Sequence, residues 1–142
     1  MLTMRAKYAL KALLHLTKHI GEGPVQAKSI AEAEHIPFKF LEGILIQLRN
    51  AGLVASKLGK GGGHFLVKDP AEVSLLTIVR SIDGPVAPLV CLSQTAYQRC
   101  DDCDDEKRCT TRRLLAGIHE SQLEQMSKIT LADGMVTGRK KT

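Results

Sequence analysis

Tryptophan is absent, and two tyrosines and three phenylalanines are the only other aromatic residues in 142. Proteins that bind single-stranded nucleic acid stack the bases on aromatic side chains, so this scarcity argues against that function. No stretch of about 18 apolar residues occurs, and we expect no membrane-spanning helix. Arg5, Lys7 and Lys11 interrupt the apolar residues near the N-terminus. We therefore expect no signal peptide and a cytoplasmic location.

The composition allows one small domain, because 44% of the residues are hydrophobic and can form a core. The net charge of +5 is unevenly distributed. Residues 1–68 contain ten Lys/Arg and four Asp/Glu, whereas residues 69–142 contain ten and eleven. The basic first half favours a polyanionic partner such as DNA, although a merely basic surface would have the same composition.

The apolar spacing predicts helices over residues 3–20, 27–34, 37–51, 75–82 and 110–128. Residues 53–57 and 64–68 form a predicted hairpin around a glycine-rich turn, and Val25 is a candidate for a short strand. We expect a mainly α fold with a small β-hairpin. Its predicted parts are a DNA-binding domain (1–83), a cysteine-bearing loop (84–109), a dimerisation helix (110–134) and a disordered basic tail (135–142).

Two helices joined by a tight turn and followed by a hairpin have the order of a winged helix-turn-helix. In that fold the second of these helices enters the major groove and the hairpin, or wing, contacts the DNA backbone or minor groove. Glu42 could accept from cytosine, and Lys39 or Arg49 could bind guanine or phosphate. Ordinary solvated charges and a plain mobile hairpin are the simpler alternatives. The predicted DNA contacts are Lys39, Phe40, Glu42, Gln47, Arg49, Lys57, Lys60, Gly61, Gly62, Gly63 and His64.

Cysteine is confined to one short segment, which contains Cys91, Cys100, Cys103 and Cys109. In a reducing compartment, clustered thiols more often bind a metal or cluster, or perform redox chemistry, than form structural disulfides. A thiol site joined to a DNA-binding domain suggests a sensor.

Several short segments, in order along the chain, resemble the Rrf-type winged-helix transcriptional regulators, a family that includes iron–sulfur cluster regulators and a nitric-oxide sensor. They are YALKAL at 8–13, GPV at 23–25, IAE at 30–32, FLE at 40–42, LRNAGLV at 48–54, GGGH at 61–64 and TLAD at 130–133. The resemblance implies a homodimer formed largely through the long C-terminal helix. Such a dimer would bind double-stranded DNA at a pseudo-palindromic operator. Leu58 and His64 depart from the family pattern, in which an arginine and a tyrosine are common.

The resemblance also implies an iron–sulfur cluster. Cluster-binding members usually have three cysteines, which correspond here to Cys91, Cys103 and Cys109. The fourth ligands known in the family do not carry over, because Arg112 and Lys7 occupy their positions, and Cys100 is our candidate instead. Four thiolates can ligate either a 2Fe–2S or a 4Fe–4S cluster.

Three other interpretations of the cysteines stay open. The four thiolates could hold a structural zinc ion, or the thiols could form a redox switch without a cluster. The pair Cys100 and Cys103 could also belong to a thiol oxidoreductase, but the βαβ context of such enzymes is missing. We expect a DNA-binding regulator without enzymatic activity and without a small-molecule substrate.

Overall fold

The computed structural model describes residues 2–135 of the chain. Its main elements are α1 (Met4–Lys18), α2 (Ala27–Glu34), α3 (Phe38–Asn50), β1 (Val54–Lys57), β2 (Gly63–Leu66), α4 (Leu75–Asp83) and α5 (Thr110–Lys128). The prediction of a mainly α fold with a hairpin is confirmed. Of the predicted tail, only Met135 is among the described residues, and it ends the short 3-10 helix η4 (Leu131–Met135).

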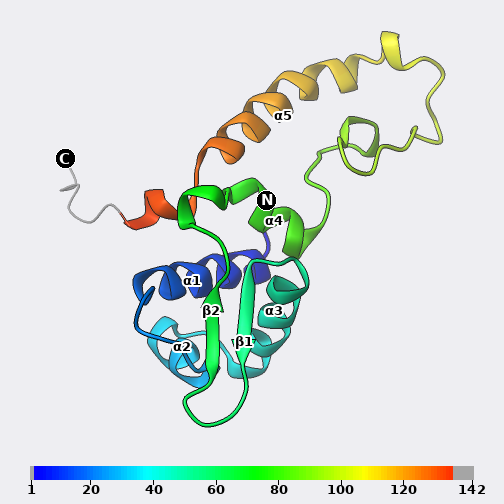
Figure 1. Cartoon of the computed structure of the whole chain (residues 1–142). Coiled ribbons are helices and arrows are strands. Elements are labelled where there is room, and N and C mark those ends of the chain that lie inside the picture. The colour runs from blue at the N-terminus through cyan, green and yellow to red at the C-terminus, as the bar shows by residue number, and fades with distance from the viewer. Residues whose placement is uncertain (1, 136–142) are drawn as a thin grey trace.

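Helices α1 to α4 and the hairpin form one packed unit, from which α5 extends away (Figure 1). The segment 84–109 runs from the end of α4 to the start of α5, which is the end of α5 farther from the packed unit (Figure 1). This segment contains two further 3-10 helices, η2 (Val90–Leu92) and η3 (Glu106–Arg108). The other end of α5 is tied to α4, because the Leu75 amide donates to the Ile129 carbonyl at 2.7 Å.

Side-chain caps mark the starts of two helices. The Thr3 hydroxyl accepts from the Ala6 amide at 3.1 Å before α1, and the Ser74 hydroxyl accepts from the Thr77 amide at 3.1 Å before α4. Each such cap satisfies one of the free N–H groups of a first helical turn and contributes about 1 kcal/mol. Pro37, which fits the first position of a helix, is instead the residue just before α3.

The core lies where α1, α2, α3 and α4 meet. Fully buried side chains from these helices include Leu13, Ile30, Leu41, Ile44, Leu48 and Ile78. Burial of each contributes about 1.5–3 kcal/mol, so this core supplies most of the stability of the unit. A smaller cluster joins α4 to α5 through Leu76, Val79, Leu123 and Met126.

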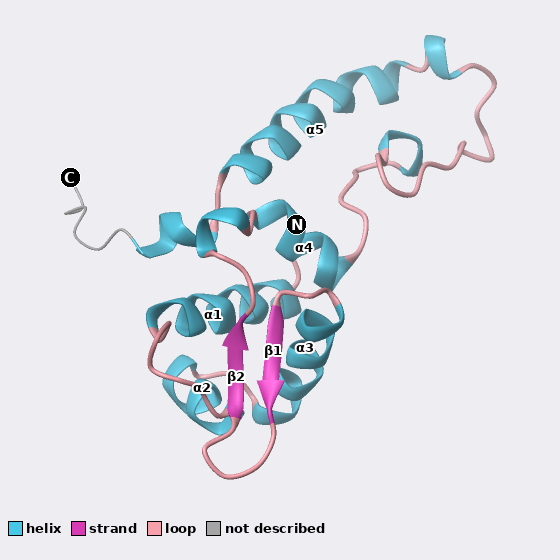
Figure 2. Cartoon of the chain, viewed as in Figure 1, coloured by secondary structure: helices cyan, strands magenta, loops and turns pink. Residues whose placement is uncertain are grey.

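The hairpin β1–β2 is antiparallel, with Val54 opposite Leu66 and Lys57 opposite Gly63 (Figure 2). The predicted strand at Val25 is a single bridge to His64, with backbone hydrogen bonds of 2.7 and 2.8 Å. This bridge fixes the wing to the turn between α1 and α2. Because β1 also packs against α3, the wing and the predicted recognition helix keep one orientation.

Candidate nucleic-acid interface and thiol site

The exposed face of α3 follows from the burial of its opposite side, where Leu41, Ile44, Leu45 and Leu48 enter the core. Lys39, Glu42 and Arg49, three of the predicted DNA contacts, are exposed. Sequence reasoning missed Ile46, which is 50% exposed, and Asn50. Their spacing from Lys39 and Glu42 is helical, so the same periodicity could have identified them.

One flank of α3 is covered by Arg5 of α1, a residue that is not among the predicted DNA contacts. Its guanidinium carbon lies 5.6 Å from the centre of the Phe40 ring, and its Nη2 donates a hydrogen bond to Oε1 of Gln47. Tyr8 meets the same Phe40 ring edge-on, with 5.9 Å between the ring centroids. Phe40 and Gln47, both predicted DNA contacts, are therefore engaged with α1.

The wing turn is closed by a hydrogen bond of 3.0 Å from the Gly62 amide to the Gly59 carbonyl. A Cβ atom on Gly62 would lie 2.2 Å from the Lys57 carbonyl oxygen, and one on Gly63 would lie 2.6 Å from the Val25 backbone. These two glycines therefore have a packing role, whereas Gly61 is exposed beside Lys60 at the tip. Leu58, which is 93% exposed, projects from the same turn.

His64 lies opposite Ser56 in the hairpin, one residue pair from the wing turn, and its Nδ1 is 2.9 Å from the Ser56 hydroxyl. Burial, and then the positive charge of Arg49, lower the pKa of His64 below its ordinary value. The imidazole is therefore neutral near pH 7, and the positive charge of the wing comes from Lys57 and Lys60, both exposed.

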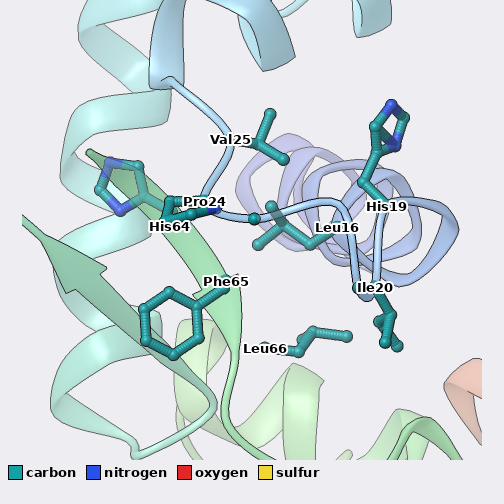
Figure 3. A pocket seen from close by; sticks show the side chains of 10 residues that line it. Leu16, His19, Ile20, Pro24, Val25, His64, Phe65 and Leu66 are labelled. Carbon is teal, nitrogen blue, oxygen red and sulfur yellow. The ribbon is translucent and has the colours of Figure 1, made fainter. Parts of the chain in front are cut away.

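A hollow of about 370 Å³ separates the end of α1 from β2 (Figure 3). Its apolar walls include Leu16, Ile20, Val25, Phe65 and Leu66, with His19 and His64 also contributing. No feature of the sequence indicated this hollow, because its walls come from two stretches, 16–25 and 64–66, that are far apart in the chain.

All four cysteines line a second hollow, of about 560 Å³. Cys91 is buried in η2, and Cys109 directly precedes α5. The Cys109 sulfur accepts from the Arg112 amide at 3.4 Å, and the Cys103 amide donates to the Cys100 carbonyl at 3.1 Å. The structure therefore places the four predicted ligands around one hollow at the start of α5, the end of that helix farther from the packed unit.

The donor chemistry of this hollow fits an iron–sulfur cluster, because thiolates are the usual cluster ligands. Arg112 also lines this hollow, and its guanidinium donates a hydrogen bond to the Cys91 carbonyl at 3.3 Å. The Nε atom of Arg112 is buried and has no hydrogen-bond partner among the described residues. A cationic side chain there would balance the negative charge of thiolates. Within residues 2–135, no three His, Cys, Asp or Glu side chains converge closely enough to hold a metal ion. Ligation by three or more of these thiols therefore requires the loop to close.

The environment of Cys100 disfavours a free thiolate. A hydrogen bond with the Cys91 thiol raises the pKa of Cys100, and burial and the negative charge of Asp102 raise it further. Asp104, Asp105 and Glu106 line the same hollow. Redox enzymes need the opposite arrangement, in which cationic groups or a helix N-terminus favour the attacking thiolate. This environment argues against the oxidoreductase interpretation of Cys100 and Cys103.

Residues 2–136 match the Rrf2 family, which is described as iron-dependent transcriptional regulators. The chain belongs to the Rrf2 family. An rrf2-like HTH-type regulator of Rhodobacter capsulatus is 47% identical over 141 residues, which cover 97% of this chain and 94% of the relative. The regulator IscR of Serratia proteamaculans is 34% identical over 132 residues, which cover 93% of this chain and 77% of the relative.

Solved structures agree with this family. CymR of B. subtilis, a global cysteine regulator, has a TM-score of 0.76 at 31% identity, with 94% of each chain covered. IscR of T. potens has a TM-score of 0.75 at 29% identity, with 95% of this chain and 85% of that chain covered. The resemblance drawn from the sequence is confirmed, and this Rrf2 protein is a DNA-binding transcriptional regulator. None of its described helices is long and apolar enough to cross a bilayer.

Proposed function

We propose that this Rrf2 regulator binds a pseudo-palindromic operator as a homodimer, with an affinity set by the state of its four cysteines. The observation that carries the proposal is the gathering of Cys91, Cys100, Cys103 and Cys109 around one hollow at the start of α5, the end of that helix farther from the DNA-binding unit. A chemical change at this position acts on the segment that links α4 to α5 and on the start of α5. It can therefore alter how two recognition helices are spaced.

The proposed DNA interface consists of the exposed face of α3 and the tip of the wing. Glu42 would accept from cytosine amino groups, and Lys39 and Arg49 would bind guanine or phosphate. Lys57 and Lys60 of the wing would contact phosphates, with the exposed Gly61 allowing close approach of the backbone. A dimer would present two such surfaces about one helical turn of DNA apart, or a multiple of it.

The proposed dimer forms through α5. Leu114 and Ile118 lie one turn apart and are 71% and 70% exposed in the single chain. Apolar side chains gathered on the exposed side of a helix are typical of a surface that another chain covers. Within residues 2–135, the buried α5 side chains that pack against α4 are Leu123 and Met126, and the packed unit does not cover Leu114 and Ile118.

We propose an iron–sulfur cluster as the cofactor, with Cys91, Cys103 and Cys109 as ligands and Cys100 as the candidate fourth. The family description as iron-dependent and the relatives named IscR support this choice. Such a cluster, when bound, supplies a centre whose charge and stability respond to oxidants and to iron supply. The protein would contribute the thiolates, the positive charge of Arg112, and the link from the Arg112 guanidinium to the Cys91 carbonyl.

A thiol switch without a cluster is the second candidate. The Cys91 thiol is the main cause of the raised pKa of Cys100, and both residues line the same hollow, so these two cysteines are the candidate disulfide-forming pair. The likeness to CymR, which is named as a cysteine regulator, favours the same alternative.

Anaerobic purification followed by an absorption spectrum and counts of iron, sulfide and zinc tests these alternatives. We expect a brown protein whose operator affinity changes when a chelator removes the iron. A colourless protein with stoichiometric zinc would instead indicate a structural zinc site. A colourless, metal-free protein that gains a disulfide in peroxide would indicate the thiol switch. Equal binding to scrambled and selected duplexes at physiological salt would rule out the regulatory function itself.

A further inference from the structure

Arg5 is held against α3 by two groups that carry no charge. Its guanidinium stacks over Phe40, and its Nη2 donates to the side-chain oxygen of Gln47. Neither interaction neutralises the cation, and no carboxylate of residues 2–135 forms a salt bridge with it. The guanidinium is therefore oriented while its positive charge stays uncompensated.

Gly43 leaves room for this arrangement on α3. A Cβ atom built on Gly43 would lie 3.8 Å from Nη2 and 4.0 Å from Nη1 of Arg5, which is ordinary van der Waals contact. The guanidinium thus lies close to the helix backbone, beside the face that exposes Lys39, Glu42 and Ile46. A side chain longer than a methyl group at Gly43 would compete for this space.

The free hydrogen-bonding groups at this place are donors. A guanidinium carries five N–H groups in a planar fork and Gln47 accepts from Nη2, so others remain available. With its oxygen engaged by Arg5, the Gln47 amide also presents its N–H₂ group. In the major groove, guanine offers two acceptors, O6 and N7, whereas adenine offers one acceptor and one donor. A surface with donors alone therefore matches guanine.

We infer that Arg5 reads a guanine of the operator through its O6 and N7 atoms, with Phe40 and Gln47 orienting the guanidinium. This inference rests on the proposed function, in which α3 enters the major groove. It assigns Gln47 a supporting role rather than a direct base contact. It also makes the N-terminal part of α1 a component of the recognition surface. Because the fork is already oriented, less rotamer freedom is lost on binding.

Guanine analogues test the inference directly. The wild-type protein selects a preferred duplex from a random library, and each guanine of that duplex is then replaced by 7-deazaguanine, which lacks the N7 acceptor. We expect one guanine in each half-site at which this replacement weakens wild-type binding by roughly tenfold. Arg5→Lys keeps the charge but loses the fork, so its affinity should change less than about twofold on the same replacement.

Two further variants test whether the dependence on guanine N7 comes from the Arg5 side chain. Lys7→Met removes one positive charge from the same helix at an exposed position and should keep the wild-type dependence on that guanine. Arg5→Gln, which removes the charge as well, should lose the guanine dependence as Arg5→Lys does. Thermal unfolding of each variant shows whether the fold is retained, and folded Arg5→Gln decides the question if Arg5→Lys unfolds.

The outcomes separate the inference from the function on which it rests. If wild-type and Arg5→Gln proteins share one 7-deazaguanine profile, Arg5 reads no base. If Arg5→Gln weakens binding to selected and scrambled duplexes by the same factor, Arg5 contacts phosphate and the inference is wrong. In both cases the selected duplex still shows that the protein recognises a sequence. A wild-type protein that selects no preferred duplex would overturn the proposed function together with this inference.

Discussion

The hydroxyl of Thr3 donates a hydrogen bond to the carboxylate of Asp83 and thereby joins the start of α1 to the end of α4. The Thr3 amide donates to the same carboxylate at 3.4 Å. Gly84, the first residue of the predicted cysteine-bearing loop, follows Asp83 directly. One side chain thus connects the beginning of that loop with the helix that carries Arg5 and contacts α3.

Asp83→Ala should weaken communication between the thiol site and the DNA interface. We expect normal iron content and dimerisation, because Asp83 contacts neither the thiols nor the exposed side of α5. The ratio of operator affinities between iron-loaded and iron-free protein should fall towards one. Couplings of this kind are typically about 1–3 kcal/mol, or roughly 5–150-fold in affinity. Thr3→Ser keeps both the donor and the helix cap and should behave as wild type. An unchanged ratio in Asp83→Ala would show that coupling takes another route.

Glu42→Ala should relax base preference more than it weakens binding in general. The Glu42 carboxylate is exposed on α3 and would accept from cytosine, a contact worth about 1–3 kcal/mol of discrimination. Fluorescence anisotropy with the selected duplex and its single-base variants measures this effect. Lys60→Ala is the matched comparison, because a phosphate contact carries no sequence information. It should weaken binding to all duplexes alike and reduce the salt slope by roughly one unit.

Gly62→Ala should destabilise the wing more than Gly61→Ala. The new methyl group at Gly62 would meet the Lys57 and Gly59 carbonyl oxygens at 2.2 and 2.8 Å, so the turn must distort, at a cost of about 1–3 kcal/mol. Gly61 has open space around it but a φ of +76°, which costs an L-residue about 1–2 kcal/mol. Thermal unfolding of both variants without DNA checks this order. A Gly62→Ala protein as stable as wild type would contradict the packing role of Gly62.

Ile118→Asp should convert the dimer into monomers with poor operator binding. The substitution would bury an unpaired carboxylate in the proposed seam between two α5 helices, and a buried unpaired charge is strongly destabilising. Ile118→Met keeps an apolar side chain and serves as the control. Light scattering measures the mass, and a dimer persisting in Ile118→Asp would place the interface elsewhere.

The fold was readable from the sequence because its signals are local. The apolar spacing placed α2 and α5 at their observed bounds, and the glycine run marked the hairpin. The Arg5–Gln47 contact spans 42 residues and the Thr3–Asp83 contact spans 80, so no local pattern could have indicated them. The packing role of Gly62 and Gly63 was missed for the same reason, since the atoms that crowd Gly63 belong to Val25. The cysteine spacing indicated the thiol site. Arg112 lies beside this site because it belongs to the first turn of α5, and the direction of that turn relative to the loop could not be read from the sequence.

The cysteine variants test the ligand set itself. Changing Cys91, Cys103 or Cys109 to Ala should abolish the chromophore, because a cluster that lacks a thiolate ligand is exposed to oxygen and water. Iron and sulfide counts on anaerobically purified protein measure the loss. Retention of a full cluster by any of these three variants would remove that residue from the proposed ligands.

Cys100 is the decisive position, because the family resemblance provides no equivalent for it. It lines the same hollow as the other three cysteines, and Arg112 occupies the position where a histidine ligand would stand. We therefore expect Cys100→Ala to lose the cluster or to bleach faster in air than wild type. If this variant instead equals wild type in iron, sulfide and air stability, the fourth ligand is not a cysteine of the same chain. Asp102 and Glu106, whose carboxylates line the hollow, would then be the next positions to change, followed by residues of a partner subunit.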